Sequence, residues 1–322
     1  MTEKINADAV APTGRSRTRP GPSRRTARKL AQVGLFSAPA LALFVLFVLV
    51  PLVFAVYYSF WHWDGLGPLV DWMGIGNYQR AMADPVFIES IRHALLITIL
   101  SVVVQQPLAL LIALALSRNF PGRTAFRIIF FAPYVISEAT IAVVWLLLLQ
   151  PAGPLDSVLG GLGFGAVTQL WLADHSIVLL TMFFVITWEY LGLSMILYLT
   201  GITQIPRDVM EAAAIDGANA RQMLRHITLP LLGPTIRVTV FLSILGSLQV
   251  FGLIQIMTDG GPFHASETPV IYIVHKGLQE TSMGYGAALS VILGMIGFAI
   301  SLAYQRFVFR RDVEGAVTSY AG

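Results

Sequence analysis

Six long apolar runs constrain the fold of this chain more than any other feature of its sequence. Each run is close to the ~20 residues that a helix needs to cross the hydrocarbon core of a bilayer. Only 12% of the residues are charged, whereas soluble domains carry about 25%. The sequence therefore predicts an all-α polytopic membrane protein with six transmembrane helices. The expected spans cover residues 33–58, 93–116, 126–150, 176–200, 235–257 and 286–308.

The chain begins with a basic stretch, residues 1–32, that holds eight Lys and Arg against two acidic residues. Its high content of Pro, Gly, Ser and Thr predicts a disordered cytoplasmic tail. The Ser23-Arg24-Arg25 sequence before the first apolar run is similar to a twin-arginine signal. That run is, however, far longer than the roughly 7–15 apolar residues of a signal peptide, so we expect an uncleaved first span. The expected organisation is this tail, a six-helix transmembrane domain over residues 33–310, and a C-terminal tail over 311–322.

The distribution of basic residues predicts the orientation in the membrane. Eighteen of the 21 Lys and Arg lie in residues 1–32, in the loops 117–127 and 201–237, and in residues 306–311 near the C-terminus. The opposite side holds only Arg80, Arg92 and Lys276. Because loops rich in Lys and Arg stay in the cytoplasm, both termini and the 201–237 loop are predicted to be cytoplasmic. The same confinement to loops argues against a nucleic-acid-binding surface.

Several classes of function lack their sequence signals. No G-x-x-x-x-G-K-[ST] sequence is present, so the chain is not expected to bind ATP through a P-loop. The six histidines show no paired ligand spacing, and the absence of cysteine excludes disulfides and thiolate metal sites. No Ser/His/Asp arrangement stands out. We therefore expect no metal, no cofactor and no enzymatic activity of the chain itself.

The loop at residues 206–234 is a polar island between two apolar runs, and it is predicted to form two short helices. Turn and cap residues punctuate it: Pro206, Gly217, Asn219, Gln222, Pro230 and Pro234. Gly217 is suited to the left-handed end of a helix, and Asn219 with Gln222 has capping-box spacing. Pro206 suits a first helical turn, and the last two prolines are expected to end the second helix. A capped hairpin at a membrane face predicts a docking element.

The same loop resembles the EAA loop of binding-protein-dependent ABC importer permeases. It contains Glu-Ala-Ala from Glu211, Asp-Gly-Ala from Asp216, and then Ile227, Leu229-Pro230 and Pro234. One departure is Leu224, where the family usually has Phe. Further motifs resemble the carbohydrate branch, the maltose and glycerol-3-phosphate type: Asn77-Tyr78 with Asp84 and Phe87, Arg127 with Pro133, and Asp259-Gly-Gly-Pro262. The resemblance extends over about residues 35–310.

This resemblance implies the type I permease fold of ABC importers and a set of partners. In the family, the loop forms a coupling helix that seats in a cleft of a cytoplasmic ATPase. The resemblance implies two ATP-binding cassette ATPase subunits, a second and different permease subunit, an extracytoplasmic sugar-binding protein, and a sugar as solute, all at a bacterial plasma membrane. The matching coupling residues are Glu211, Ala212, Ala213, Asp216, Gly217, Ala218 and Leu224. The alternative is a hairpin that merely joins two spans.

Polar side chains inside the spans are candidates for the solute path. Carboxylates at mid-bilayer are costly and usually face a cavity or a partner. Such carboxylates are Glu138 and Glu189, and the second stands between two aromatic residues, an arrangement suited to sugars. In the family, the spans on either side of the loop line the cavity. The predicted path residues are therefore Trp188, Glu189, Tyr190, Ser243, Ser247 and Gln249.

Each path residue has an alternative role. Serines in a span can bond their own backbone or support helix packing, Trp188 can pack or anchor at the interface, and Glu138 can bridge spans or subunits. Two other functions also remain open: an ABC permease for a non-sugar solute, and a proton-coupled secondary transporter. The latter is expected to show internal repeats, which the two halves lack. The outward loops 59–92, 151–175 and 259–285 are the expected docking surface for the binding protein.

Overall fold

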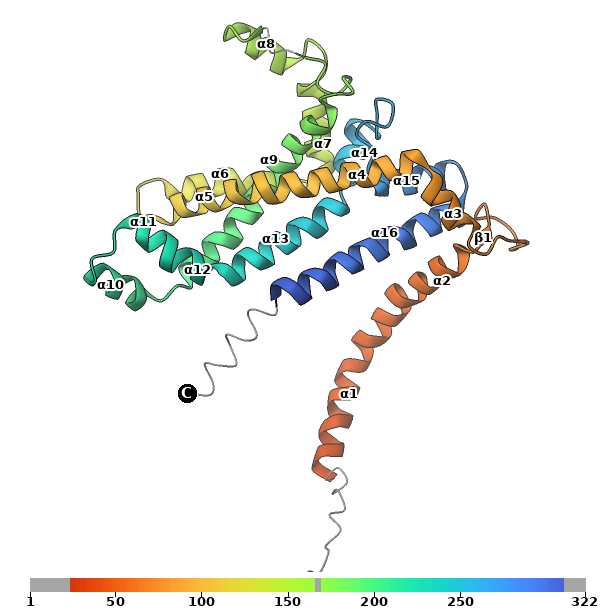
Figure 1. Cartoon of the computed structure of the whole chain (residues 1–322), viewed down its shortest axis with the longest axis horizontal. Coiled ribbons are helices and arrows are strands. Elements are labelled where there is room, and N and C mark those ends of the chain that lie inside the picture. The colour runs from red at the N-terminus through yellow and green to blue at the C-terminus, as the bar shows by residue number, and fades with distance from the viewer. Residues whose placement is uncertain (1–23, 166–168, 310–322) are drawn as a thin grey trace, which may run out of the picture. The chain divides into compact units, whose positions relative to one another are not determined.

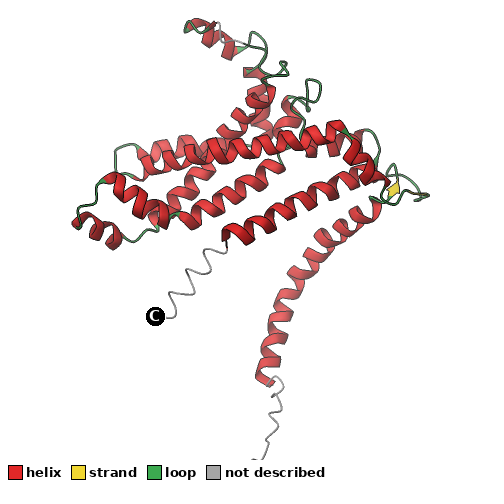
Figure 2. Cartoon of the chain, in the orientation of Figure 1, coloured by secondary structure: helices red, strands yellow, loops and turns green. Residues whose placement is uncertain are grey.

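The computed structural model describes residues 24–165 and 169–309. The chain divides into two units, residues 1–54 and 55–322, and the described residues of both are mostly helical (Figure 2). The N-terminal unit contains α1 (Arg24–Phe44), a π-helical turn and the start of α2 (Val50–Tyr58). Because α1 begins at Arg24, part of the stretch expected to be a tail is helical. Residues 1–23 of that tail and the predicted tail at 311–322 lie outside the described residues.

The predicted helical membrane architecture is confirmed. Among the described residues, five helical stretches are long and apolar enough to cross a membrane, and a sixth span arises if one bent pair of helices is counted. The five are Gln32–Tyr58, Pro85–Ser117, Val178–Thr203, Gly233–Met257 and Met283–Val308. The bent pair consists of α6 (Arg123–Val135) and α7 (Glu138–Leu148).

The third span differs from the continuous helix expected over residues 126–150. The two halves of the pair meet at an angle of 98°. Ser137 has the non-helical dihedrals φ −58° and ψ 130°, and Ile136 is extended. Pro133 lies one turn earlier and cannot donate a backbone hydrogen bond, which weakens the helix at this point. The bend directs the first residue of α7, Glu138, toward the interior of the bundle.

The second unit surrounds α9 (Val178–Thr203), which packs against α5 (Gln106–Ser117), α6 and α13 (Gly233–Leu248). The contact with α6 is close at Gly192, where an added Cβ would lie 2.0 Å from the carbonyl oxygen of Phe130. Only glycine fits here, and small residues of this kind let membrane helices approach one another. Met195 and Tyr198 of α9 continue the buried core toward α5.

Several short elements of this unit lie toward the two ends of its long helices (Figure 1). At one end are α10 (Arg207–Ile215), α11 (Ala220–Met223) and α12 (Leu229–Leu231). At the other are β1, α3 and α15. Bounds of the remaining elements are β1 Trp61–His62, β2 Asp71–Trp72, α3 Gly76–Ala83, α4 Pro85–Leu100, α8 Pro154–Gly161, α14 Gly252–Met257, α15 Pro269–Val274 and α16 Met283–Tyr304. The two short strands pair antiparallel, with Trp61 opposite Trp72.

Asp84 joins three helices at the end that holds α3. It is the N-cap of α4, and its carboxylate accepts hydrogen bonds from the backbone of Val86 and Phe87. It also accepts hydrogen bonds from the hydroxyls of Tyr272 in α15 and Tyr285 in α16. This cap explains why the second span begins at Pro85 rather than at residue 93 as expected.

Replacing Asp84 with alanine is therefore expected to lower the stability of the fold. A lost N-cap costs about 1 kcal/mol, and a lost hydrogen bond to a charged acceptor costs roughly 1.5–3 kcal/mol. We expect a destabilisation of roughly 2–4 kcal/mol, measured as thermal unfolding of the purified protein. Asp71→Ala, at an exposed aspartate of β2, is the matched control and should change stability by less than about 0.5 kcal/mol. Equal effects of the two substitutions would refute this role.

A second polar cluster lies in the segment between α14 and α16. Glu267 is 1% exposed, and its carboxylate pairs with His264 and with His275. His275 also contacts Asp259 through Nε2 at 2.9 Å. Burial by itself lowers the pKa of His275, but the hydrogen bonds to Asp259 and Glu267 outweigh this and raise its pKa above the ordinary value.

The stability of this segment is expected to fall as the pH rises. A folded-state pKa above the unfolded value of about 6.5 means that the stabilisation is complete below that pH and is lost as the pH rises through the folded pKa. Thermal unfolding of the purified protein should thus occur at a lower temperature at about pH 9 than at about pH 6. His275→Gln should reduce this difference. An unchanged pH dependence in that variant would contradict the assignment.

Candidate functional site

The polar loop between α9 and α13 forms the predicted helical hairpin. Gly217 follows α10 with a φ of +82°, in the left-handed region that favours glycine. Asn219 Oδ1 accepts from the backbone N–H of Gln222 at 3.0 Å, and Gln222 Oε1 accepts from the N–H of Asn219 at 2.8 Å. The predicted capping box is thus confirmed. Pro206 occupies the N-cap of α10, next to its expected place in the first turn.

The two later prolines differ from expectation. Pro230 lies in the first turn of α12 and Pro234 in the first turn of α13. They begin helices instead of ending one, because a first turn tolerates the missing N–H of proline. From Ala220 to Leu231 the chain stays helical, with a π-helical turn at Leu224–Thr228.

The hairpin presents its predicted coupling residues at the surface. Glu211, Ala212, Asp216 and Gly217 are exposed, whereas Ala213, Ala218 and Leu224 are half-buried. None of the residues of α10 is buried. Its last residue, Ile215, is 86% exposed. A shallow depression of about 280 Å³ is lined by Asp216, Gly217, Ala218, Gln222, His226 and Ile227.

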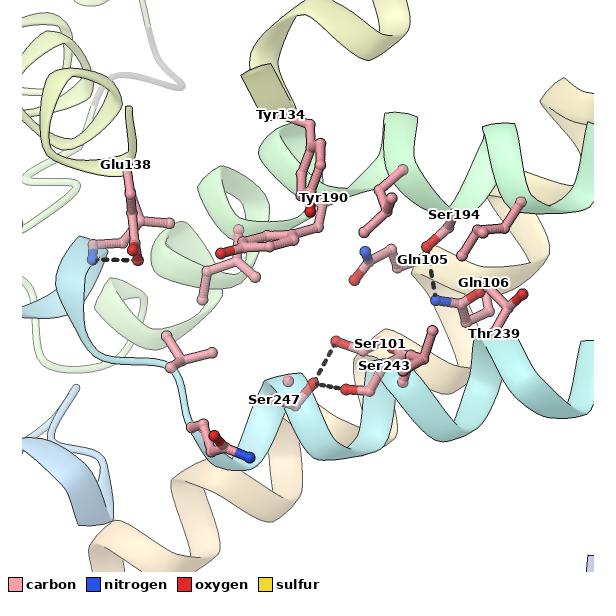
Figure 3. A pocket seen from close by; sticks show the side chains of 18 of the residues that line it. Ser101, Gln105, Gln106, Tyr134, Glu138, Tyr190, Ser194, Thr239, Ser243 and Ser247 are labelled. Carbon is pink, nitrogen blue, oxygen red and sulfur yellow. Dashed lines mark hydrogen bonds between the residues drawn. The ribbon is translucent and has the colours of Figure 1, made fainter. Parts of the chain in front are cut away.

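A larger cavity of about 570 Å³ opens between the helices of the second unit (Figure 3). Its walls come from the π-helical turn Ser101–Gln105 and the start of α5, from the α6–α7 bend, from α9 and α13, and from the chain that leads into α14. The polar residues of its lining are Ser101, Gln105, Gln106, Tyr134, Glu138, Tyr190, Ser194, Thr239, Ser243, Ser247 and Gln249. Such a ring of hydroxyl and amide groups within apolar helices provides many hydrogen-bonding groups to a solute.

Hydrogen bonds between helices hold several of these side chains in place. Gln106 Nε2 donates to Ser194 Oγ at 3.1 Å, and the hydroxyl of Tyr198 donates to Gln106 Oε1 at 2.8 Å. The hydroxyl of Ser247 is hydrogen-bonded to Ser101 Oγ at 3.2 Å and to the backbone oxygen of Ser243 at 2.8 Å. Two separate hydrogen-bonded groups, one around Gln106 and one around Ser247, therefore fix polar side chains in the cavity wall.

Glu138 lies at the bend in the third span, on the cavity wall. Its Oε1 accepts a hydrogen bond from the backbone N–H of Leu253 at 3.0 Å. A Cβ added at Gly252 would lie 2.9 Å from its carboxyl carbon, so glycine makes room for the carboxylate. Glu138 thus both lines the cavity and bridges α7 to α14.

The predicted path residues separate into two groups. Tyr190, Ser243, Ser247 and Gln249 line the cavity. Trp188 does not line the cavity. Its ring packs edge-on against Trp145 with centroids 5.5 Å apart, which agrees with the alternative that Trp188 is a packing residue. Glu189 is 3% exposed and lies behind the lining, and none of the described residues donates a hydrogen bond to its Oε2. A contact of any of these residues with solute stays a prediction.

Sequence reasoning missed polar residues in four of the spans. These are Ser101, Gln105 and Gln106 in the second span, Tyr134 in the third, Ser194 in the fourth and Thr239 in the fifth. Gln105 and Gln106 stand side by side in an apolar run, and polar residues within spans are a recognised signal of function. The two adjacent glutamines therefore gave a sequence signal for a functional site. A single serine, threonine or tyrosine within a span is a much weaker signal.

A partly enclosed cavity with polar side chains among its apolar walls, between membrane helices that an exposed capped hairpin joins, indicates a membrane permease. The sequence agrees with this class. Residues 105–313 match the family model described as binding-protein-dependent transport system inner membrane component. The chain belongs to this family, and the predicted resemblance is confirmed.

Individual relatives extend over most of the chain. A probable ABC transporter permease protein of Bacillus subtilis is 33% identical, covering 85% of this chain and 94% of the relative. A multiple sugar-binding transport system permease protein of Streptococcus mutans is 31% identical, covering 80% and 88%. A chain in the crystal structure of a bacterial ABC transporter involved in the import of the acidic polysaccharide alginate has a TM-score of 0.78 at 24% identity, covering 89% and 99%. This structural likeness shows the fold.

Proposed function

We propose that this chain forms part of the translocation path of an ABC importer for a sugar, a mono- or oligosaccharide. A separate ATPase docks on the hairpin and supplies the energy, and an extracytoplasmic binding protein delivers the sugar to the outward loops. A second, different permease subunit completes the cavity. The termini and the hairpin face the cytoplasm, in keeping with the charge distribution described above.

One observation carries this proposal: the hairpin connects two walls of the cavity directly. α9 ends at Thr203 and α13 begins at Gly233, so the chain between them is the hairpin itself. Both helices contribute to the cavity lining. A partner that moves the hairpin as a rigid body therefore displaces both walls, which is the mechanical link that a transporter driven by an external ATPase requires.

The chemistry of the cavity supports a sugar as the solute. Hydroxyl and amide side chains can both donate to and accept from sugar hydroxyls. The rings of Tyr134 and Tyr190 lie with centroids 5.9 Å apart and offer apolar faces beside the polar groups. The name of the Streptococcus mutans relative also points to sugar transport.

A proton-coupled secondary transporter is the second candidate, and one observation favours it. Glu189 is buried, with an oxygen to which no described residue donates, as in a proton relay. This second candidate function leaves the exposed hairpin without a role, because a secondary transporter needs no docked ATPase.

Purification of the tagged chain from its native membrane separates the two candidates. We expect an ATPase with a P-loop to co-purify, and Glu211→Lys to reduce its recovery relative to Glu280→Lys, a charge reversal at an exposed glutamate outside the hairpin. Recovery of the chain without any ATPase would favour the secondary transporter.

A further inference from the structure

The part of the cavity that this chain's described residues form contains an acidic side chain and no basic one. Among the described lining residues, Glu138 is the only carboxylate, and there is no Lys, Arg or His. The buried carboxyl group of Glu189 lies close enough to Glu138 for the two to interact electrostatically. Arg237 is on α13, but its guanidinium lies against Gly233, at the start of that helix. Nothing in the described lining therefore compensates a negative charge.

We propose that the cavity selects uncharged saccharides and rejects anionic ones, with Glu138 as the residue that determines this specificity. The inference rests on the proposed transport function and specifies its solute class. Sugars that carry carboxylate or phosphate groups are excluded by like-charge repulsion, and uncharged sugars are accepted by the hydroxyl and amide groups.

The position of Glu138 makes the repulsion effective. The backbone N–H of Leu253 holds its carboxylate at the bend of the third span, so the side chain cannot turn away from the solute without losing this bond. Charges in an apolar, partly enclosed cavity are screened much less than at a surface. An unpaired anion brought into such a site is strongly disfavoured, and specificity of this kind is produced by repulsive elements as well as attractive ones.

A preference for uncharged solutes would distinguish this chain from a structural neighbour. The alginate importer, whose solute is an acidic polysaccharide, shares the fold at 24% identity. Fold alone does not fix the solute, and the side chains of the lining point to a different class.

Because the chain contains no cysteine, the charge preference can be measured with a single introduced thiol. Ser243→Cys places the thiol in the cavity, and Leu162→Cys places a control thiol at a position that is 67% exposed. The purified complex is treated with three methanethiosulfonate reagents of similar size, one neutral (hydroxyethyl), one anionic (sulfonatoethyl) and one cationic (trimethylammonioethyl). The rate of labelling of this chain is followed by mass spectrometry and divided by the rate at the control thiol.

The expected result is that the anionic reagent reacts in the cavity at least ~10-fold more slowly than the neutral one. Glu138→Gln keeps an oxygen that accepts from Leu253, so it should retain the fold and shrink this ratio to less than about threefold. Equal rates for the anionic and neutral reagents, or a ratio unchanged by Glu138→Gln, would overturn the proposal. Absence of labelling by all three reagents at both Ser243→Cys and Gly246→Cys would also overturn it, since the cavity would then be closed to solutes.

The same complex in proteoliposomes distinguishes this inference from the function on which it rests. An uncharged oligosaccharide that the binding protein retains is compared with its uronic-acid derivative, each at a concentration that saturates the binding protein. We expect uptake of the first to exceed uptake of the second at least ~10-fold, and less so with Glu138→Gln. Equal uptake of both overturns the charge selection and leaves sugar transport standing. If neither is taken up although the thiol reagents show the charge preference, the proposed function fails and the selection stands.

Discussion

Gly217→Val should uncouple transport from ATP hydrolysis while the protein still inserts into the membrane. The φ of Gly217 is +82°, and a left-handed conformation costs roughly 1–2 kcal/mol for a residue with a side chain, more if it is β-branched. A Cβ at this position would meet no atom within 4 Å, so the effect is confined to the backbone of the turn. The hairpin then tilts α10 out of the orientation in which a partner can hold it. We expect uptake to fall at least ~10-fold.

Glu211→Lys should have the same result by another route. Glu211 is exposed on α10 and can pair with a basic residue of the docked partner, so reversing its charge replaces attraction with repulsion.

The matched control for Gly217→Val is Gly217→Asn, because asparagine adopts the left-handed conformation more readily than valine. Uptake and ATP hydrolysis are measured on the same reconstituted complex. Unchanged uptake in both Gly217→Val and Glu211→Lys would refute the role of the hairpin.

Gly246→Trp should block the cavity without destabilising the protein. Gly246 lines the cavity, and a Cβ added there meets nothing within 4 Å. A larger side chain therefore enters open space, and replacing a glycine inside α13 improves helix propensity by up to about 1 kcal/mol. We expect the thermal stability to be unchanged or raised, and uptake to fall at least ~10-fold because the indole occupies the solute path.

The control for this substitution is Gly294→Trp. Gly294 lies in α16, also with nothing within 4 Å of an added Cβ, and it is not part of the described cavity lining. Uptake by this variant should remain within about twofold of the native protein, since surface substitutions have small effects. Equal losses in the two variants would show that the cavity is not the path.

Local sequence signals predicted the spans and the hairpin well, because their causes are local. Apolar run length determines where a helix can cross a membrane, and the capping box at Asn219 and Gln222 is a contact between neighbours in the chain. The 98° bend of the third span was not predicted. Pro133 identifies a weak point, but whether a helix breaks there depends on what it packs against, such as Gly192 of α9.

The cavity was only partly predictable because the spans are apolar on every side. A soluble helix shows its buried face by periodicity, whereas a membrane helix is apolar toward both lipid and core. Consecutive residues of a helix point about 100° apart. Trp188 and Tyr190 are two residues apart and so point to nearly opposite sides of α9. Only Tyr190 lines the cavity, while Trp188 packs on Trp145. Gln105, in the π-helical turn, and Gln106, the first residue of α5, join the site because the turn packs against α13 and α9 and α5 packs against α9. The sequence alone does not specify this packing.

The most direct test of the account is the energy source of uptake. The purified complex is reconstituted into proteoliposomes with ATP inside and presented with a radiolabelled sugar loaded on its binding protein. We predict uptake that requires ATP, persists when a protonophore collapses the proton gradient, and is lost in Gly217→Val. Uptake that proceeds without ATP and stops on addition of the protonophore would contradict the account.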